Sequence, residues 1–352
     1  MAENSVFAEI HHELSAKLVP CGKWNLPLFY PGGSLAEHRN IHASAGIFDQ
    51  TGTRAFQVAG RDVVKVLEHS LLRPVSFLPV GGSMDNCLLY EDGTIAMVFT
   101  LCRMQENDFM FLIMRGTDAA AVKYFTGLFS PSLEIRELTE AMAFLTVAGK
   151  TASTILSTAG ADSLPQPGCW QMITLADEDG DIFRCIAIRH DRFGETAFDL
   201  CCNVSVALEV YAAIYRINGV TPAGISAWES MRLEGAEPGI PEFSGGVSPS
   251  EAALSAWISP SRKFIGSNAP LITAPRSILA LFSLERHPLP AGSAVTLSDD
   301  LPAGVVTSSA FCPISGSARH ICRIPSVEGV SKISCVVNDL PVSLPFSIIS
   351  VK

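Results

Sequence analysis

The sequence is poor in charged and aromatic residues and has no long apolar run. Charged residues make up 17% and aromatic residues 8% of its 352 residues, whereas hydrophobic residues make up 48%. A charged share below the roughly 25% of ordinary globular chains excludes a disordered protein and predicts a large core. No segment approaches the roughly 18 uninterrupted apolar residues of a membrane-spanning helix, so we expect no membrane partner.

Clusters of positive charge are also missing. The chain has 25 basic against 35 acidic residues, a net charge of −10, and no run of Lys and Arg. Proteins that bind nucleic acids or anionic membrane surfaces carry such clusters, so neither partner is expected. The first residues lack the basic start and apolar stretch of a secretory signal, so we expect the mature protein to begin near Met1.

Metal-binding cysteine motifs are absent. None of the ten cysteines forms a C-x-x-C pair, and the only close pair, Cys201 and Cys202, is adjacent. Neighbouring residues of a strand point to opposite faces, which hinders them from sharing one metal ion. His11 and His12 are likewise adjacent on an expected helix. We therefore expect free thiols, a reducing cytoplasmic location and no metal site.

The spacing of apolar residues divides the chain into two regions. Helical and strand-like spacings alternate up to residue 271, and from residue 272 short apolar runs alternate with Pro, Gly and Ser, which is typical of a small β-barrel or sandwich. The sequence therefore predicts an α+β protein with domains 1–271 and 272–352. Its clearest segments are expected helices at 5–18, 62–72, 119–128, 151–159, 203–215 and 225–234, strands at 52–60, 109–114, 143–147 and 182–188, and a hairpin at 87–101.

Common catalytic motifs are absent as well. The chain has no G-x-S-x-G elbow, P-loop, H-E-x-x-H pair or clean dinucleotide-binding fingerprint. Its eight histidines are dispersed, which favours structural roles for them. Composition and common motifs therefore indicate an α+β protein without indicating its activity.

Seven groups of short motifs occur in one order over nearly the whole chain, from about residue 25 to Phe346. Each alone is weak, but together they resemble the glycine cleavage system T-protein (aminomethyltransferase) family. There the motifs read P-x-x-Y with E-H, G-[IL]-F-D with V-x-G-x-D-A, E-x-G-G, G-E-x-G-[FY]-E, R-D-S-L-R-L-E, T-P-x-E with D-F-I-G, and G-x-V-T-S. Here they correspond to residues 27–30 with 37–38, 46–49 with 56–62, 91–93, 194–199, 230–234, 248–251 with 263–266, and 304–308.

The resemblance implies a fold, a cofactor and partners. Family members have two interleaved α+β subdomains, here with residues 53–135 as the inserted one, and a C-terminal β-barrel. They bind tetrahydrofolate and move a one-carbon unit from a nitrogen, sulfur or oxygen substituent onto the pterin N5. The implied partners are therefore folate and a small one-carbon donor, with a lipoyl-carrier protein as a further candidate.

The sequence departs from the family where the resemblance locates the catalytic carboxylate. The family has I-x-D-D-L after the hairpin, and one of these aspartates is required for the transfer, whereas Met97 and Val98 stand in their place. Neither side chain can stabilise positive charge or accept a proton, so Met97 would line a more apolar cofactor site. Asp85 is the candidate for a relocated catalytic carboxylate, and the alternative is a solvated turn residue after Gly81-Gly82.

Two acidic residues are candidates for holding the pterin. The N3–H and exocyclic amine of the ring are adjacent donors, and a carboxylate is the side chain that can accept from both. The family's pterin-binding acid corresponds to Asp199, which is one methylene shorter than glutamate. Glu195 is the other acid of this motif, and a surface charge is its alternative role.

Two residues near the R-D-S-L-R-L-E motif complete the predicted cofactor site. Trp228 stands where the family has an arginine, so a cation that could meet a ligand carboxylate is lost. Its ring could stack on the ligand or pack in the core. Arg232 keeps the second arginine of the motif and could bind the ligand or form a structural ion pair with Glu234 at a helix end.

Three functions are compatible with these residues. The first is a tetrahydrofolate-dependent one-carbon transferase, for which Asp199 is retained. The second is a catalytically silent protein that binds folate or another flat heterocycle, which a pocket made more apolar by Met97, Val98 and Trp228 favours. The third is an interface role with a vestigial cavity, for which the sequence offers no positive feature. We expect the transferase.

Overall fold

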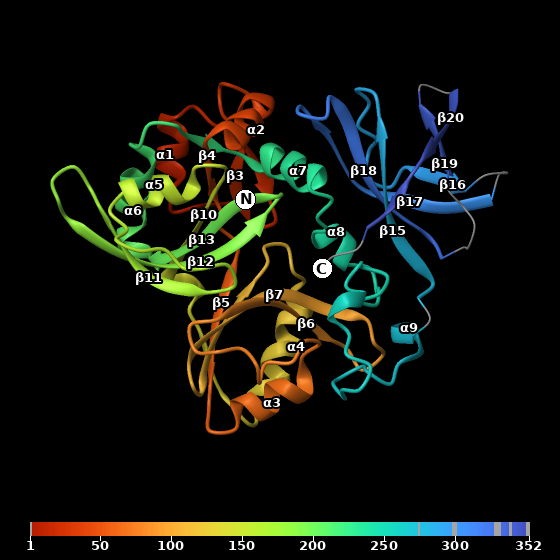
Figure 1. Cartoon of the computed structure of the whole chain (residues 1–352), viewed down its shortest axis with the longest axis horizontal. Helices are drawn as coiled ribbons and strands as arrows, with labels where there is room; N and C mark the ends of the chain where they lie inside the picture. Colours follow the sequence, from red (N-terminus) through yellow and green to blue (C-terminus); the bar gives the residue numbers. More distant parts are fainter. Residues whose placement is uncertain (1, 274, 298–300, 327–331, 338–339, 350–352) are drawn as a thin grey trace. The chain divides into compact units, whose positions relative to one another are not determined.

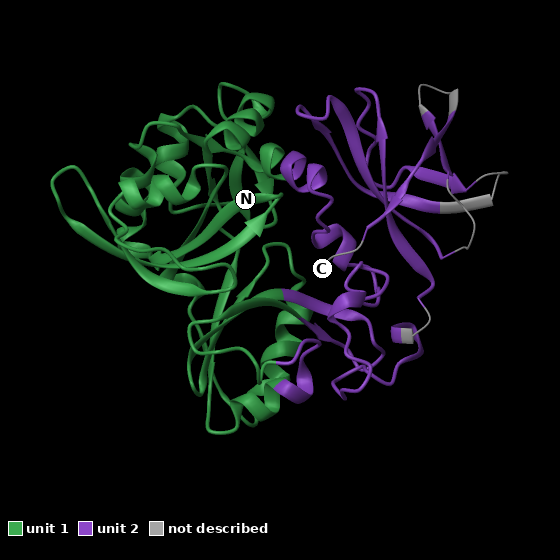
Figure 2. Ribbon diagram, viewed as in Figure 1, with its two compact units in different colours: residues 1–67, 75–86, 99–228 green, residues 68–74, 87–98, 229–352 purple. Residues whose placement is uncertain are grey.

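The computed structural model describes residues 2–273, 275–297, 301–326, 332–337 and 340–349. The chain forms two compact units, each built from separate stretches of sequence (Figure 2). The first unit comprises residues 1–67, 75–86 and 99–228, and the second comprises residues 68–74, 87–98 and 229–352. The expected division at residue 272 remains a prediction about domains.

A six-stranded sheet in the order β11-β12-β13-β10-β4-β14 is the largest sheet of the first unit (Figure 1). Its strands are β4 (Ala45–Asp49), β10 (Met142–Ala148), β11 (Trp170–Ala176), β12 (Ile182–Arg192), β13 (Glu195–Asn203) and β14 (Val220–Ala223). The associated helices are α1 (Ala8–Glu13), α2 (Ser34–Ala43), α5 (Ala152–Thr158), η2 (Val204–Val206), α6 (Ala207–Tyr215) and the start of α7 (Ile225–Glu234). One face of the sheet buries Leu145 and Phe198 against α5 and α6.

A five-stranded sheet in the order β6-β7-β8-β5-β9 follows the same alternation of side chains. Its strands are β5 (Arg54–Ala59), β6 (Ser83–Leu89), β7 (Ile95–Gln105), β8 (Asp108–Ile113) and β9 (Glu134–Glu137), with α3 (Val63–Ser70), α4 (Ala119–Phe129) and η1 (Thr139–Ala141) nearby in the chain. Phe111 packs on Phe125 of α4, on one face. On the other face, Cys102 and Met110 share a core with Phe144 of the six-stranded sheet. These strands lie within residues 54–137, close to the expected inserted subdomain.

The second unit contains a seven-stranded antiparallel sheet in the order β20-β19-β16-β17-β18-β15-β21. Its elements are α8 (Ile240–Phe243), η3 (Ser255–Trp257), α9 (Pro270–Thr273), β15 (Ser277–Leu284), β16 (Ala294–Leu297), β17 (Leu301–Cys312), β18 (Ser317–Pro325), β19 (Lys332–Val337), β20 (Leu340–Pro345) and β21 (Ser347–Ile348). The sheet buries Phe282, Ile324 and Ile333 in one core. The expected all-β, barrel-like C-terminal region is confirmed.

The beginning of the chain differs from the sequence-based expectation. The helix expected at 5–18 is only α1, because residues 17–21 form β2 (Lys17–Cys21) and pair with β3 (Trp24–Phe29), which also pairs with β1 (Glu3–Asn4). Ser15 has φ +56°, which is incompatible with a continuing helix. Helix α2 was not expected, because it buries polar Glu37 and His38 and so lacks a clear apolar stripe.

The remaining expected elements of the α+β region are confirmed with shifts of a few residues at their ends. The hairpin around Asp92-Gly93 is formed by β6 and β7. Cys201 and Cys202 do enter different cores on opposite faces of β13. Among the described residues, no helix is both long and apolar enough to cross a membrane.

Candidate functional site

A polar cluster surrounds Asp199 on the face of the six-stranded sheet that α5 and α6 do not cover. The strand register sets Thr146 of β10 and Ile188 of β12 opposite Asp199. Because side chains alternate, Leu200 enters the helix-covered core and Asp199 points to the other face. Asp199 Oδ1 accepts a hydrogen bond from Thr146 Oγ1 at 2.7 Å, and Oδ2 accepts one from Arg192 Nη2 at 2.9 Å.

These partners keep the Asp199 carboxylate ionised. Burial is the largest influence and by itself raises the pKa of Asp199. The positive charge of Arg192, the nearby His190 and the hydrogen bond from Thr146 together outweigh it, so the pKa lies below its usual value. The side chain is 19% exposed. Asp199 is therefore a charged acceptor that part of a ligand can still reach.

His190 lies beside this carboxylate, with its Nε2 atom 3.4 Å from Asp199 Oδ2. That nitrogen is buried and has no well-aligned hydrogen bond to the residues that the structure describes. Burial lowers the pKa of His190 and Arg192 lowers it further, whereas Asp199, Asp85 and Asp191 act in the opposite direction without restoring it. The imidazole is therefore neutral near pH 7 and can accept a proton.

Asp85 belongs to the same electrostatic neighbourhood but comes from the five-stranded sheet. It lies within β6, and its Oδ1 accepts a hydrogen bond from Thr100 Oγ1 of β7 at 2.7 Å. Its charge acts on the pKa of His190 and on that of Cys102, whose thiol burial keeps protonated. The alternative role as a solvated turn residue is wrong, because Asp85 is a half-buried strand residue.

A tight turn links this cluster to an aromatic pair. Strand β12 ends at Arg192 and β13 begins at Glu195, so Phe193 and Gly194 form the loop, with φ values of +61° and +75°. Two positive φ values define a type I′ hairpin, which suits glycine and strains phenylalanine. Phe193 is nevertheless only 5% exposed, and its ring meets that of Trp228 edge to face, with centroids 4.8 Å apart. Packing on Trp228 thus offsets the strain.

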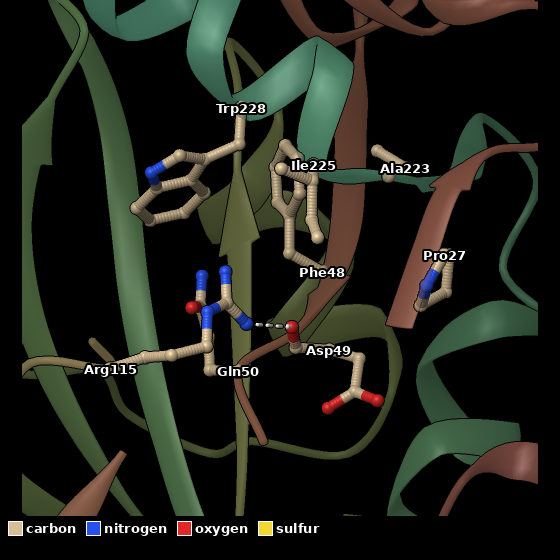
Figure 3. Close-up of a pocket in the computed structure, with 9 residues that line it drawn as sticks. Pro27, Phe48, Asp49, Gln50, Arg115, Ala223, Ile225 and Trp228 are labelled. Carbon is tan, nitrogen blue, oxygen red and sulfur yellow. Dashed lines mark hydrogen bonds between the residues drawn. The ribbon is translucent and has the colours of Figure 1, made fainter. Parts of the chain in front are cut away.

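Trp228 also lines a hollow within the first unit (Figure 3). The hollow is small and partly open to solvent, with room for about one water molecule. Phe48 packs edge to face against Trp228 at a centroid distance of 5.1 Å, and Arg115 and Gln50 supply polar groups below the indole (Figure 3). Trp228 is half-buried, so it both packs on aromatic neighbours and presents part of its ring to the hollow.

Glu195 is engaged by helix α2. Its Oε1 lies 2.7 Å from His42 Nδ1, and the two side chains are 19% and 26% exposed, respectively. This contact makes Glu195 part of the protein's own polar network, so the surface-charge alternative does not describe it fully. A role of Glu195 in holding a ligand remains a prediction.

Arg232, in the second unit, is surrounded by its own partners. Its guanidinium makes two hydrogen bonds to Glu229 Oε2 and one each to Glu242 Oε2, the Glu237 carbonyl and Ser308 Oγ, at 2.6 to 3.1 Å. These bonds occupy all five donors of an arginine. The residue is 4% exposed. The geometry therefore fits the structural alternative, although the partners are Glu229 and Glu242 rather than the expected Glu234.

Met97 is 2% exposed and Val98 is 5% exposed, and both belong to the second unit. As successive residues of β7 they point to opposite faces of the strand, so at most one of them can line any single ligand surface. A contribution of Met97 to cofactor binding remains a prediction.

Several polar residues of these sites were not expected from the sequence. His190 and Arg192 belong to the charged run of residues 189–192, to which no role was assigned from the sequence. Their spacing along β12 is a usable signal, because residues two apart share a strand face. Thr146 and Arg115 carried no such signal, since only the pairing of distant strands brings them to the site.

The comparisons with known proteins agree with this architecture. The family model described as "GCVT N-terminal domain" matches residues 7–262. An aminomethyltransferase of Xanthomonas axonopodis pv. citri is 26% identical over 340 residues, covering 93% of this chain and 90% of the relative. One from Xylella fastidiosa is 25% identical over 341 residues with the same coverage.

A solved structure of glycine cleavage system aminomethyltransferase T from Bartonella henselae superposes with a TM-score of 0.86 at 23% identity, covering all of this chain and 97% of that one. At this identity the likeness shows the fold, which confirms the predicted T-protein-like α+β architecture. Because the family model spans well over half of the sequence, this chain belongs to the GCVT aminomethyltransferase family, of which it is a divergent member.

Proposed function

We propose that this protein is a tetrahydrofolate-dependent one-carbon transferase of the aminomethyltransferase type. The observation that carries the proposal is the pairing of an ionised Asp199 with a neutral His190, in electrostatic reach of a second carboxylate, Asp85. A one-carbon transfer to a ring nitrogen needs such groups, because positive charge develops on the carbon and the nitrogen loses its proton.

The donor set around Asp199 fits a pterin. An ionised carboxylate has about four lone-pair sites, and the hydrogen bonds from Thr146 and Arg192 occupy two of them, one at Oδ1 and one at Oδ2. Each oxygen therefore keeps one site that can accept a ring N–H. When bound, tetrahydrofolate supplies the nucleophilic nitrogen that receives the carbon.

The chain's own residues would then divide the work. Asp199 orients the ring, and Asp85, held by Thr100, stabilises positive charge in place of the family's missing aspartate. His190 accepts a proton at Nε2, the atom that has no well-aligned partner among the described residues. A lipoyl-carrier protein bearing an aminomethyl group is the proposed one-carbon donor. The ten free cysteines favour a reducing, cytoplasmic location.

Calorimetric titration with tetrahydrofolate and its 5-formyl derivative tests the binding step. Asp199→Asn keeps the shape of the side chain but removes its charge, and should weaken binding about 10-fold or more, the worth of one charged hydrogen bond. Asp162→Asn, an exposed acid of the same unit, is the matched control. Equal affinity of the native protein and Asp199→Asn would contradict the assignment of the pterin site.

Turnover is tested separately with an aminomethylated lipoyl-carrier protein, by measuring ammonia release and methylene-tetrahydrofolate formation. Asp85→Asn should lower the rate about 10²-fold or more while leaving the affinity for tetrahydrofolate nearly unchanged. Tight binding without any turnover, for this and other one-carbon donors, would establish the silent binding protein instead.

A further inference from the structure

Two histidines lie on the same side of helix α2. His38 and His42 are four residues apart, so one turn of the helix brings their side chains together. Their ring centroids are 5.0 Å apart, and a nitrogen of one ring lies within 4.8 Å of a nitrogen of the other. Two histidines at this helical spacing are a recurrent arrangement for chelating a zinc ion.

The separation of the two rings matches that of imidazoles bound to one metal ion. With metal–nitrogen distances of about 2.0–2.1 Å and coordination angles of about 90–110°, the ring centroids would be about 4.5–5.2 Å apart. The observed 5.0 Å falls within this range. The ring planes are tilted by 43°, so the two imidazoles are not stacked face to face. A small rotation of the side chains can therefore direct one nitrogen of each ring at a shared ion.

Glu195 orients one of the two rings. Its Oε1 atom lies 2.7 Å from His42 Nδ1. Metal-bound histidines usually donate their second ring N–H to a carboxylate, because this bond fixes the tautomer and makes the other nitrogen a better ligand. The contact with Glu195 therefore assigns Nε2 of His42 to the metal ion.

Helix α2 is a firm support for the pair. Glu37, on the same helix, accepts hydrogen bonds from the backbone N–H groups of Tyr30 at 2.5 Å and Gly224 at 3.0 Å. Asn40, which lies between the two histidines, donates to the carbonyl oxygen of Gly219 at 3.2 Å. These bonds tie the helix to neighbouring segments of the first unit. Metal binding would therefore require little movement of the backbone.

We propose that His38 and His42 bind one divalent transition-metal ion such as zinc, with solvent completing its coordination. Imidazole nitrogens favour such ions over Mg²⁺ and Ca²⁺, which prefer oxygen ligands. The ion would enter beside His42, whose side chain is 26% exposed, because His38 is fully buried. The sequence-based expectation of no metal site rested on the cysteines and on His11 and His12, and helix α2 was not expected. None of the residues assigned to the transfer reaction takes part, so this inference goes beyond the proposed function.

Calorimetric titration of the metal-free full chain with Zn²⁺ and Mg²⁺ tests the site. Zn²⁺ should bind at one equivalent with a Kd of about 10 μM, and Mg²⁺ at least about 100-fold more weakly. Paramagnetic Ni²⁺ should first broaden the NMR ring signals of two of the eight histidines, those of His38 and His42. No binding of Zn²⁺ up to about 1 mM, or first broadening of other histidines, would overturn the proposal.

Variants assign the binding to the proposed residues. Glu195→Gln should weaken Zn²⁺ binding about 10-fold, because the amide oxygen still accepts the hydrogen bond but carries no charge. His42→Gln removes a ligand and should raise the Kd to about 1 mM or above. Both positions are half-buried, and circular dichroism checks that the variants fold. His12→Gln, which removes an exposed histidine of the same unit, is the matched control and should bind as the native chain does.

Unchanged Zn²⁺ affinity in folded His42→Gln would overturn the assignment. Asp199→Asn should retain Zn²⁺ binding, so failure of the pterin site is distinguishable from failure of the metal site.

Discussion

Replacing Arg232 tests whether this residue has a structural or a ligand-binding role. The resemblance to the family made Arg232 a candidate for the cofactor site, whereas in the structure its five donors are bound to groups of the second unit. Glu242, one of its partners, is fully buried and also accepts from the Gly239 backbone N–H and the Thr307 and Ser308 hydroxyls. Arg232→Met keeps the length of the stem but leaves the Glu242 carboxylate without its counter-charge.

The expected loss of stability is large. Removing one partner of a buried ion pair costs about 3–5 kcal/mol, because the remaining charge stays buried and uncompensated. That is a substantial fraction of the roughly 5–15 kcal/mol that stabilises a folded protein. Glu242→Gln, which retains most of the hydrogen bonds, should cost less than Arg232→Met. Arg54→Met, which breaks a half-exposed pair with Glu137, should cost at most about 1 kcal/mol.

Urea unfolding followed by circular dichroism measures these free energies, and calorimetry at low temperature measures the tetrahydrofolate affinity of the folded variants. We expect Arg232→Met to shift the urea midpoint strongly and to leave the affinity of the folded protein within about 3-fold of the native value. A variant that unfolds at the native midpoint but loses tetrahydrofolate binding would refute the structural role and return Arg232 to the ligand site.

Three further outcomes follow from the site and its surroundings. The pKa of His190 in the folded state lies below its unfolded value of about 6.5, so the unfolded state binds more protons and the free energy of unfolding falls as the pH drops below about 6.5. His190→Gln should reduce this pH dependence of the urea midpoint between about pH 5 and 7. An unchanged pH dependence would contradict the burial argument. Met97→Asp should lower the Tm by several degrees, because it buries an unpaired carboxylate at a position that is only 2% exposed. A Tm within about 2 °C of the native value would show that water can reach the position. Phe193→Gly relieves about 1 kcal/mol of backbone strain but removes a buried ring that contributes about 3–5 kcal/mol, so denaturant unfolding should show a net loss of stability. A stabilised variant would mean that the contact with Trp228 contributes little.

The sequence was informative where a local pattern decides the structure. The Asp92-Gly93 turn predicted the hairpin of β6 and β7, because two apolar arms around a turn dipeptide can pair without help from the rest of the chain. The sequence-based prediction was wrong at residues 17–21, where pairing with β3 overrides a helical spacing of apolar residues. Strand pairing between distant segments is a tertiary effect that a single-sequence pattern does not contain.

The candidate site was predictable only in part for the same reason. Asp199 could be selected because a family motif marks its position, and Asp85 was selected as a replacement for the missing catalytic carboxylate; both carboxylates act on His190. Their partners could not be selected, since Thr146 reaches Asp199 through the β10–β13 register and Thr100 reaches Asp85 from the next strand. Chain position alone also left the role of Arg232 open, and the packing around it indicates a structural role.

One departure from the family affects its surroundings in the first unit. Trp228 replaces a cation, and its ring packs on that of Phe193, which is in a strained conformation. An aromatic contact that offsets backbone strain fixes the turn between β12 and β13. The same turn carries Arg192, the residue that holds Asp199 ionised. The pair of Trp228 and Phe193 therefore does more than make the site apolar. By fixing the turn, it determines the position of Arg192, whose positive charge keeps Asp199 ionised.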